Sequence, residues 1–290
     1  MSTNRVQKIL DQTGAVALPG VYDTLSAKIC QRAGFPLAFV SGYSVAAATI
    51  GEPDLGLLTQ TEMCDQARRI CMSVDIPVIV DADTGYGNAL NVHRTVNEWI
   101  AAGAAGCFLE DQVWPKRCGH LRGKRLIERE EYIHRIQAAV EARAGRDFFI
   151  VARTDALAVA GMDEAVARVV AAREAGADAS FVEAPGSIEE LTQIGQRCLA
   201  PNVANMIQGG KTPVLKKQQL EELGFHLILH PLCSLFAAAE AMQQVCRKLH
   251  VDGDTFDLTT PTMSFDEFNE LIGVEEKIAL AERFEADTEG

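Results

Sequence analysis

Short, continuous apolar runs alternate with longer amphipathic stretches along most of the chain. Apolar runs without a polar residue at every second position are typical of strands that are buried on both faces. They predict strands near Val16–Leu18, Leu37–Val40, Val78–Val80, Cys107–Leu109, Phe149–Ala152, Ser180–Val182, Val203–Asn205 and Leu227–Leu229. The amphipathic stretches predict helices over Thr24–Ala33, Thr61–Ser73, Val92–Ala102, Arg129–Ala142, Asp163–Ala175, Ile188–Arg197 and Lys216–Leu223.

The junctions from helix to strand repeat one local pattern, in which a helix end is followed by glycine and then by an apolar residue. It occurs at Arg32–Phe35, Ala101–Ala104, Glu174–Ala177 and Glu222–Phe225. Glycine tolerates the left-handed conformation that ends helices, so the repeat marks one kind of joint used several times. Strands that alternate with helices in this way predict an α/β protein with a (β/α)8 TIM barrel. A doubly wound open sheet is the alternative, but no G-x-G-x-x-G follows the first strand.

Additional helices are expected after the eighth strand. Phe236–Leu249 has a helical pattern, and Ser264 with Glu267 forms the sequence signature of a capping box. Phe265, Phe268, Leu271 and Ile272 give the helix that follows an apolar stripe, which we interpret as a packing surface. No internal linker is evident. We therefore predict a single domain over residues 1–290, with C-terminal helices from about 233 to 290 involved in oligomer contacts.

Composition and charge narrow the class of protein. The 290 residues suit one large barrel, and the net charge of −13 argues against a general nucleic-acid or membrane surface. The 8 cysteines form no C-x-x-C pair, which favours reduced thiols in the cytosol over a disulfide framework. No apolar run resembles a signal peptide or is long enough to span a bilayer. We expect a cytoplasmic protein, with an organelle form that has lost its transit segment left open.

Polar or charged residues follow almost every predicted strand. In barrels the carboxyl ends of the strands meet at one rim, where active sites lie, so these residues predict a site there. They are Ser41-Gly42-Tyr43, Asp81-Ala82-Asp83, Glu110-Asp111, Arg153-Thr154-Asp155, Glu183, Asn205 and His230-Pro231.

Two of these strand ends supply carboxylates suited to a metal. Asp81 and Asp83 are two residues apart, so both can lean to one side of a strand end, and Glu110 follows the next strand. Asp54, on the long loop after the second strand, adds a further carboxylate. An all-oxygen cluster is typical of Mg²⁺ or Mn²⁺, and the absence of histidine disfavours zinc. Capping aspartates are the alternative interpretation.

A basic run stands out in this acidic chain and carries a cysteine. Cys118 lies among Lys116, Arg117, His120, Arg122, Lys124 and Arg125. Nearby cations lower the pKa of a thiol, so we expect an activated Cys118 and an anionic substrate, with a solvated basic loop as the alternative. Arg153 is suited to clamp a substrate carboxylate or to pair with Glu183 or a metal-site aspartate. Gly209–Thr212, after Asn205, resembles a loop that binds an anion, although the sequence signal is weak without a full P-loop.

Taken together, these motifs resemble the isocitrate lyase / phosphoenolpyruvate mutase superfamily over nearly the whole chain. The matching segments are Ser41–Ser44, Pro53–Gly56, Asp81–Gly87, Glu110–Gln112, Lys116–His120, Ala152–Ala156 and Asn205. The Lys-Arg-Cys-Gly-His run looks like the catalytic loop of the lyase branch. Tyr43, the run Gly119–Lys124 and the segment Ala204–Pro213 are more similar to 2-alkylmalate lyases, including 2,3-dimethylmalate lyase, than to 2-methylisocitrate lyases.

The resemblance implies a helix-swapped barrel, Mg²⁺ dependence with Mn²⁺ possible, and a homo-oligomer, with a tetramer favoured over a dimer. It also implies a carbon–carbon (oxo-acid) lyase. Such an enzyme would cleave a 2-hydroxy dicarboxylate or tricarboxylate of the 2-alkylmalate or 2-methylisocitrate type to a 2-oxo acid such as pyruvate plus a carboxylate. Cys118 would then protonate the departing carbanion. The alternatives are an oxaloacetate hydrolase or decarboxylase, phosphonopyruvate or carboxyphosphonoenolpyruvate mutase-type chemistry, and a non-catalytic binding barrel.

The motifs and the resemblance together define the expected site. We expect catalytic roles for Cys118, His120, Arg153, Glu110 and Tyr43. We expect substrate contacts from Ser41, Gly42, Tyr43, Lys116, Gly119, His120, Arg153, Glu183, Asn205 and Pro231. The expected metal ligands are Asp81, Asp83, Asp54 and Glu110.

Overall fold

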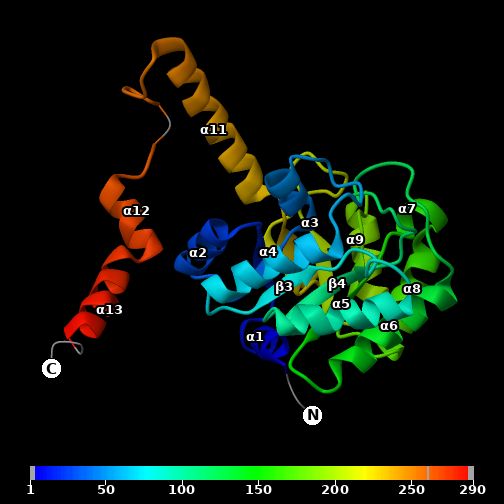
Figure 1. Ribbon diagram of the computed structural model, residues 1–290. Coiled ribbons are helices and arrows are strands. Elements are labelled where there is room, and N and C mark those ends of the chain that lie inside the picture. Colours follow the sequence, from blue (N-terminus) through cyan, green and yellow to red (C-terminus); the bar gives the residue numbers. More distant parts are fainter. Residues whose placement is uncertain (1–3, 260, 287–290) are drawn as a thin grey trace. The chain divides into compact units, whose positions relative to one another are not determined.

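Parallel strands in chain order close into a barrel in the computed structural model, which describes residues 4–259 and 261–286. The strands are β1 (Val16–Val21), β2 (Ala38–Val40), β3 (Val78–Asp81), β4 (Gly106–Glu110), β5 (Phe149–Thr154), β6 (Ala179–Val182), β7 (Asn202–Asn205) and β8 (Leu227–His230). Each pairs with the next, and β1 pairs with β8. The (β/α)8 prediction is therefore confirmed, and every predicted strand is present (Figure 1).

Helices surround the barrel at the predicted places. They are α2 (Thr24–Arg32), α4 (Gln60–Ser73), α5 (Ala89–Ala101), α6 (Arg129–Arg143), α8 (Met162–Glu174), α9 (Ile188–Arg197) and α10 (Lys217–Glu222). Sequence patterns did not predict α1 (Arg5–Thr13) or the short α3 (Gly42–Val45), η1 (Ala46–Ile50) and α7 (Leu157–Ala160). The predicted joint is confirmed, since Gly34, Gly103, Gly176 and Gly224 all have positive φ angles, between 85° and 108°.

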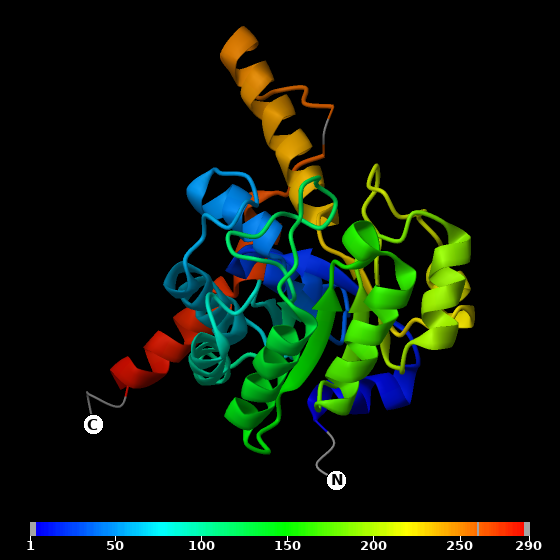
Figure 2. The same ribbon diagram turned by 90° about the vertical axis from the view of Figure 1, so that its right-hand side faces the viewer.

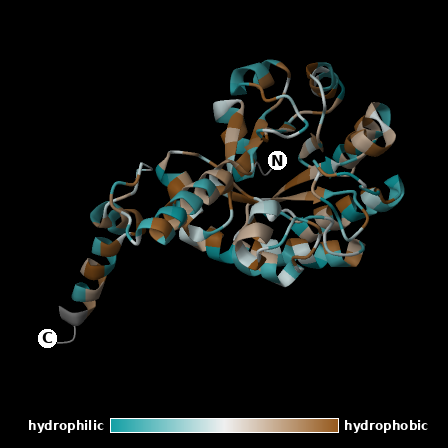
Figure 3. Ribbon diagram, turned by 90° about the horizontal axis from the view of Figure 1, so that it is seen from above, coloured by the Kyte–Doolittle hydropathy of each residue, from teal (hydrophilic) through white to brown (hydrophobic). Residues whose placement is uncertain are grey.

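The strands are buried on both sides, which explains their continuous apolar sequences. Inside the barrel, alternate strand residues such as Leu18, Phe39 and Ile79 form one apolar cluster. Their neighbours, such as Val40 and Val80, face outward and pack against the helices. Figure 3 shows the apolar strands at the centre of the barrel and polar residues on the surrounding helices.

The longest connection in the barrel lies between β4 and α6. Residues 111–128 contain no helix or strand, and their one bridge joins Gln112 to Leu126. The segment leaves from the carboxyl end of β4, so it covers the rim where active sites of barrels lie. It carries Cys118, and it appears in Figure 2 as the loops at the upper end of the green strand. We call it the rim loop.

Contacts divide the chain into two compact units, Met1–Leu235 and Phe236–Gly290. The C-terminal helices are α11 (Cys233–Asp252), α12 (Phe265–Ile272) and α13 (Val274–Ala286). The predicted capping box is present, with Ser264 accepting from the Glu267 amide and Glu267 from the Ser264 amide. In the predicted apolar stripe, Leu271 is buried, whereas Phe265 is 80% exposed. The interpretation of residues 1–290 as a single domain stays a prediction.

No helix among the described residues is long and apolar enough to cross a membrane. The described structure also leaves every one of the 8 cysteines free, in agreement with the prediction that they form no disulfide framework.

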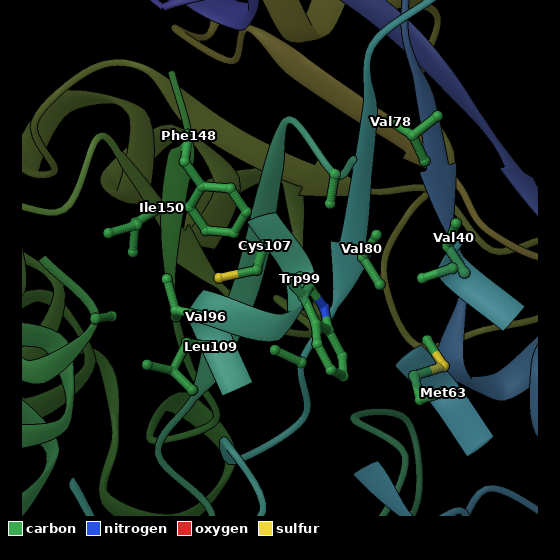
Figure 4. Packing of buried hydrophobic residues seen from close by; sticks show 14 of the residues in the cluster. Val40, Met63, Val78, Val80, Val96, Trp99, Cys107, Leu109, Phe148 and Ile150 are labelled. Atoms are coloured by element: carbon green, nitrogen blue, oxygen red, sulfur yellow. The ribbon is translucent and has the colours of Figure 1, made fainter. Parts of the chain in front are cut away.

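Trp99 of α5 should be a major contributor to the stability of the barrel. Its side chain is fully buried, and Figure 4 shows its ring between Val80 of β3 and the pair Val96 and Leu109. Trp99→Ala should lower the free energy of unfolding by about 3–5 kcal/mol, because it leaves a large cavity. Leu90→Ala on the same helix is the matched control. Leu90 is 80% exposed, so this change should stay within about 0.5 kcal/mol. Equilibrium urea denaturation measures both, and equal losses would contradict this role of Trp99.

Candidate active site

The end of β3 presents two buried aspartates to the rim. The backbone amide of Asp83 donates to Asp81 Oδ1 at 3.0 Å. Asp83 has a positive φ of 46°, a conformation that aspartate tolerates better than most residues. Gly42 makes room for Asp81, because a Cβ at that position would lie 2.8 Å from Asp81 Oδ2.

Lys116 of the rim loop reaches into this group of carboxylates. Its Nζ lies 2.5 Å from Asp54 Oδ1 and 2.8 Å from Asp83 Oδ1, and its side chain is only 2% exposed. Burial disfavours the charged ammonium, but Asp83 and Asp54 outweigh that effect and raise the pKa of Lys116. Burial also raises the pKa of Asp83 to about 6, even though Lys116 opposes the rise.

The four predicted metal ligands do not converge on one point. Asp54 and Asp83 surround Lys116, while Glu110 lies beside Arg153, with 3.2 Å between Glu110 Oε2 and Arg153 Nη2. Across residues 4–259 and 261–286, no group of three or more His, Cys, Asp or Glu residues is arranged to hold a metal ion. The chemistry of these residues nevertheless suits a hard cation. All four offer carboxylate oxygens, all are buried, and Glu110 Oε1 has no hydrogen-bond partner among the described residues.

Arg153, at the end of β5, is held by three carboxylates. Its Nε donates to Asp155 Oδ2 at 3.0 Å, and its Nη2 lies 3.2 Å from Glu110 and 3.6 Å from Glu183. The guanidinium also lies over the Phe181 ring, 5.6 Å from its centroid. The structure thus shows the pairing with Glu183 that we considered for Arg153, and Arg153 also lines the central cavity.

His120 connects the rim loop to β6 and β7. Its Nδ1 accepts a hydrogen bond from the backbone amide of Lys211 at 3.0 Å, and its Nε2 lies 3.3 Å from Glu183 Oε1. An accepting Nδ1 leaves the proton on Nε2, which lies beside the Glu183 carboxylate but makes no hydrogen bond among the described residues. The Lys211 amide belongs to the predicted anion-binding loop, Gly209–Thr212, and here it binds the histidine.

Glu183 is the acceptor shared by several of these groups. Asn205 Nδ2 lies 3.3 Å from both of its carboxylate oxygens. Burial disfavours ionisation of Glu183, but Arg153 and His120 outweigh it and lower the pKa of this carboxyl to about 2. Glu183 is therefore ionised at neutral pH.

Cys118 differs from our expectation. Its pKa is raised to about 11, first because the partly buried thiol is desolvated and second because Asp54 is near, with Glu183 adding to the rise. The expected activation by neighbouring cations is wrong for a physical reason. The Lys116 ammonium lies between Asp54 and Asp83, which offset its charge, and the Arg117 side chain is exposed to solvent. Cys118 is therefore a protonated thiol at neutral pH, suited to give a proton rather than to attack as a thiolate.

The rim loop closes over a cavity at the carboxyl end of the barrel. The predicted residues that line it are Ser41, Tyr43, Asp54, Asp81, Cys118, Gly119, His120, Arg153, Glu183, Asn205 and Pro231. Gly42, Asp83, Glu110 and Lys116, which we also predicted for the site, are not part of this lining. The cavity has a volume of about 50 Å³, which is small beside the ~300–1,000 Å³ of typical small-molecule sites. The loop thus encloses the site tightly in this structure.

Sequence reasoning missed the apolar floor and wall of the cavity. Phe39, Phe108, Phe181 and Leu229 line it from inside the barrel, and Ile207 and Leu232 line its side. The first four are inward-facing strand residues, so they looked like ordinary core. Their alternation with the polar residues at the strand ends was the only signal. Asp155 and Lys124 also make buried contacts here. The sequence presents Asp155 only as part of a strand end and Lys124 only as part of the basic run.

The sequence matches known proteins over most of its length. A family model described as phosphoenolpyruvate phosphomutase matches residues 6–250. The chain is 49% identical to "Carboxyvinyl-carboxyphosphonate phosphorylmutase, chloroplastic" of Arabidopsis thaliana, covering 97% of this chain and 84% of that protein. It is 43% identical to 2,3-dimethylmalate lyase of Eubacterium barkeri, covering 93% and 94% of the two chains.

Solved structures agree with this match. A crystal structure of 2,3-dimethylmalate lyase aligns with a TM-score of 0.89 at 38% identity, covering 95% of this chain and 92% of that one. Oxaloacetate acetylhydrolase with the inhibitor 3,3-difluorooxalacetate has a TM-score of 0.89 at 33% identity, covering 95% and 94%. Phosphonopyruvate hydrolase in complex with oxalate and Mg²⁺ has a TM-score of 0.87 at 30% identity, covering 98% and 99%.

The raised pKa of Cys118 predicts that its thiol is alkylated slowly at neutral pH. Near pH 8, iodoacetamide should alkylate Cys118 roughly 100-fold or more slowly than the exposed Cys246, because only the thiolate reacts. The rate at Cys118 should keep rising as the pH approaches about 11. Mass spectrometry of the two peptides over a pH series measures both rates. A plateau in the Cys118 rate below about pH 9 would show that its pKa is not raised.

Proposed function

The chain belongs to the phosphoenolpyruvate phosphomutase family as a lyase of the isocitrate lyase superfamily, and on that basis we propose that it cleaves the C2–C3 bond of a 2-hydroxy dicarboxylate or tricarboxylate. The products would be a 2-oxo acid, such as pyruvate, and a second carboxylate. One observation carries this proposal. A protonated thiol, Cys118, is held on a closed loop over a cavity lined with arginine and carboxylates.

We propose Mg²⁺, or Mn²⁺ in its place, as the cofactor, held by Asp81 with Asp54, Asp83 and Glu110 taking part. These are buried oxygen donors, and the related phosphonopyruvate hydrolase was crystallised with Mg²⁺. A bound cation would supply Lewis-acid stabilisation for the negative charge on the carboxylate and C2 oxygen of the substrate. Lys116 shares Asp54 and Asp83 with this site and balances their charge.

Arg153 is the group that we propose to bind the C1 carboxylate of the substrate. Three protein carboxylates fix the position of its guanidinium, so little side-chain freedom is lost when substrate binds. Ser41 and Gly42 at the start of α3, and Asn205 at the end of β7, supply polar groups around it. Because Glu183 holds both His120 and Asn205 in place, the polar side of the cavity is ordered before substrate arrives.

The proposed reaction moves two protons. The C2 hydroxyl gives up one proton, and Glu110 is the acceptor that we favour, because burial raises its pKa and its Oε1 is unpaired among the described residues. The C2–C3 electron pair then leaves with the departing fragment, which carries the charge as a carbanion next to a carboxylate. Cys118 donates its proton to that carbon. A thiol with a pKa of about 11 keeps its proton until so strong a base appears.

The shape of the cavity supports a substrate with an alkyl substituent. Ile207, Pro231 and Leu232 contribute apolar side chains to its lining. Methyl or larger alkyl groups on C2 or C3 gain from burial there, at about 0.8 kcal/mol for each CH₂. We therefore favour 2-alkylmalate-type acids, such as 2,3-dimethylmalate, over 2-methylisocitrate, whose third carboxylate would meet these apolar side chains.

Hydrolysis of oxaloacetate is the second candidate, favoured by the similarity to oxaloacetate acetylhydrolase. It would use the same metal carboxylates and Arg153. Assays with 2,3-dimethylmalate, 2-methylisocitrate, oxaloacetate, isocitrate and phosphonopyruvate in the presence of Mg²⁺ distinguish the candidates.

We also propose that the chain forms a homo-oligomer through its C-terminal unit, by exchange of helices between copies. Phe236, Phe256 and Phe265 are large apolar side chains exposed on this unit in the single chain. A tetramer is favoured, and sedimentation velocity of the full chain measures the assembly directly. A monomer at micromolar concentration would contradict this proposal.

Removal of divalent metal should abolish turnover, and Mg²⁺ or Mn²⁺ should restore it. Asp81→Asn keeps the size of the side chain but removes its charge, so it should weaken Mg²⁺ binding by about 10-fold or more while the fold survives. Isothermal titration with Mg²⁺ measures the binding, and circular dichroism checks the fold. Reactivation by Zn²⁺ alone, or unchanged Mg²⁺ affinity in Asp81→Asn, would contradict the proposed site.

Cys118→Ser should retain substrate binding but lose about 10²–10⁴-fold in kcat, the usual contribution of a general acid. Serine is nearly isosteric, so the rim loop can still close, but its hydroxyl is a far weaker proton donor than a thiol. Steady-state kinetics on the best substrate of the panel measure kcat and KM separately. The exposed Cys246→Ser is the matched control and should be unchanged. Full lyase activity in Cys118→Ser would rule out Cys118 as the donor.

A further inference from the structure

Lys124 makes a buried contact that the proposed reaction does not use. It lies on the rim loop, six residues after Cys118, and its side chain is only 2% exposed. Its Nζ donates to the backbone carbonyl of Gly119 at 2.6 Å and to Asp155 Oδ1 at 2.7 Å. One ammonium thus joins the residue next to Cys118 to the end of β5.

The anchor at β5 is firmly held. Asp155 is fully buried, and its backbone amide donates to Asp111 Oδ1 at 2.9 Å. Asp111 in turn accepts from Arg168 of α8 at 3.2 Å. The second oxygen of Asp155 accepts from Arg153 Nε at 3.0 Å. Because Asp155 is fixed from several sides, it is a stable point against which a loop can be held.

Closure of the rim loop is a tight fit at Gly119. A Cβ there would collide with Glu183 Cγ and would lie 2.7 Å from Arg153 Nη2. The cavity volume is only about 50 Å³, less than the ~300–1,000 Å³ of typical small-molecule sites, so movement of the loop would make room for a substrate. The backbone carbonyl of Gly119 is also the group that accepts the hydrogen bond from Lys124. The position of Cys118 over the cavity therefore depends on how firmly this carbonyl is held.

Two other attachments of the loop on either side of Cys118 involve the proposed site itself. Lys116 pairs with Asp54 and Asp83, and His120 with Glu183, so bound metal or substrate can alter both contacts. Lys124 and Asp155 do not line the cavity. Their contact therefore lies outside the cavity lining and joins the loop to the end of β5.

We propose that Lys124 is a positioning residue whose ion pair with Asp155 latches the rim loop closed and so holds Cys118 at the reacting carbon. The role in catalysis rests on the proposed function of Cys118, but the latch itself is a property of the loop. The competing explanation is that Lys124 only balances the charge of the buried Asp155 carboxylate.

The two explanations differ in the double variant Lys124→Met/Asp155→Asn. It leaves no unpaired buried charge, since the amide that replaces the Asp155 carboxylate is neutral and its oxygen can still accept from Arg153. It also leaves no ammonium to hold the Gly119 carbonyl. If Lys124 only balances charge, this variant should keep the loop as closed as in the unaltered protein. If Lys124 is a latch, the loop should open more often, as in Lys124→Met.

The test measures how often the loop opens, through alkylation of Cys118 by iodoacetamide in the full chain with Mg²⁺ present. Opening exposes the thiol, so Lys124→Met and the double variant should raise the Cys118 rate by about 10-fold or more, the effect expected when a charge-assisted hydrogen bond is lost. Lys124→Arg should restore much of the slow rate. Arg122→Met, an exposed cation on the same loop, is the matched control and should leave the rate unchanged. Cys246 gives the internal reference rate in every sample.

Each outcome decides one question. If Cys118 in the folded double variant stays as slow as in the unaltered protein, the latch is refuted, whatever the lyase activity. If Lys124→Met does not fold, the double variant and Lys124→Arg still decide the outcome. Where substrate turnover is measurable, the latch predicts that kcat falls more than KM changes. Fast alkylation in a chain that cleaves no acid of the panel would refute the proposed function and leave the latch standing.

Discussion

The concentration of buried charge at one end of the barrel governs the rest of this molecule. Asp81 and Asp83 lie at the end of β3, Glu110 at the end of β4 and Glu183 at the end of β6, so the closed parallel sheet brings all four to the same rim. Isolated carboxylates cannot stay ionised in such a place, because the cost of desolvation is too large. The chain meets this constraint with cations from two sources. Arg153 comes from β5, within the sheet, and Lys116 comes from the rim loop above it.

This arrangement couples closure of the loop to the charge balance of the site. Lys116, His120 and Lys124 all belong to the loop, and each contacts a carboxylate of the barrel. When the loop closes, it therefore completes the electrostatics of the rim and covers the cavity at the same time. Its closing also places Cys118 in a buried, carboxylate-rich environment, which keeps the thiol protonated. A group that donates a proton to a carbanion needs this state, and it needs bulk water to be excluded.

The local features of the chain predicted the fold well. The strands have continuous apolar sequences and the helices end at glycines such as Gly34 and Gly103, so each element is recognisable from its own residues. Helix α1 was not predicted, although its buried residues Val6 and Leu10 have helical spacing. The short helices α3 and α7 were not predicted because 4 residues each make barely one helical turn, too little for a repeating pattern. The aromatic floor was missed because Phe39, Phe108 and Phe181 differ in no local way from other core residues.

The sequence by itself determined which chemical groups reach the rim, because a polar residue at a strand end must lie there once the barrel closes. It identified Asp81, Glu110, Arg153 and Cys118, and the run around Cys118 indicated the lyase branch of the superfamily. Only the tertiary structure decided the state of these groups. Lys116 and Cys118 are two residues apart, so the sequence suggested that the ammonium lowers the pKa of the thiol. In the fold the ammonium lies between Asp54 and Asp83, and burial raises the thiol pKa instead. A pKa depends on desolvation and on distances to charges from other strands, and neither can be deduced from neighbours along the chain.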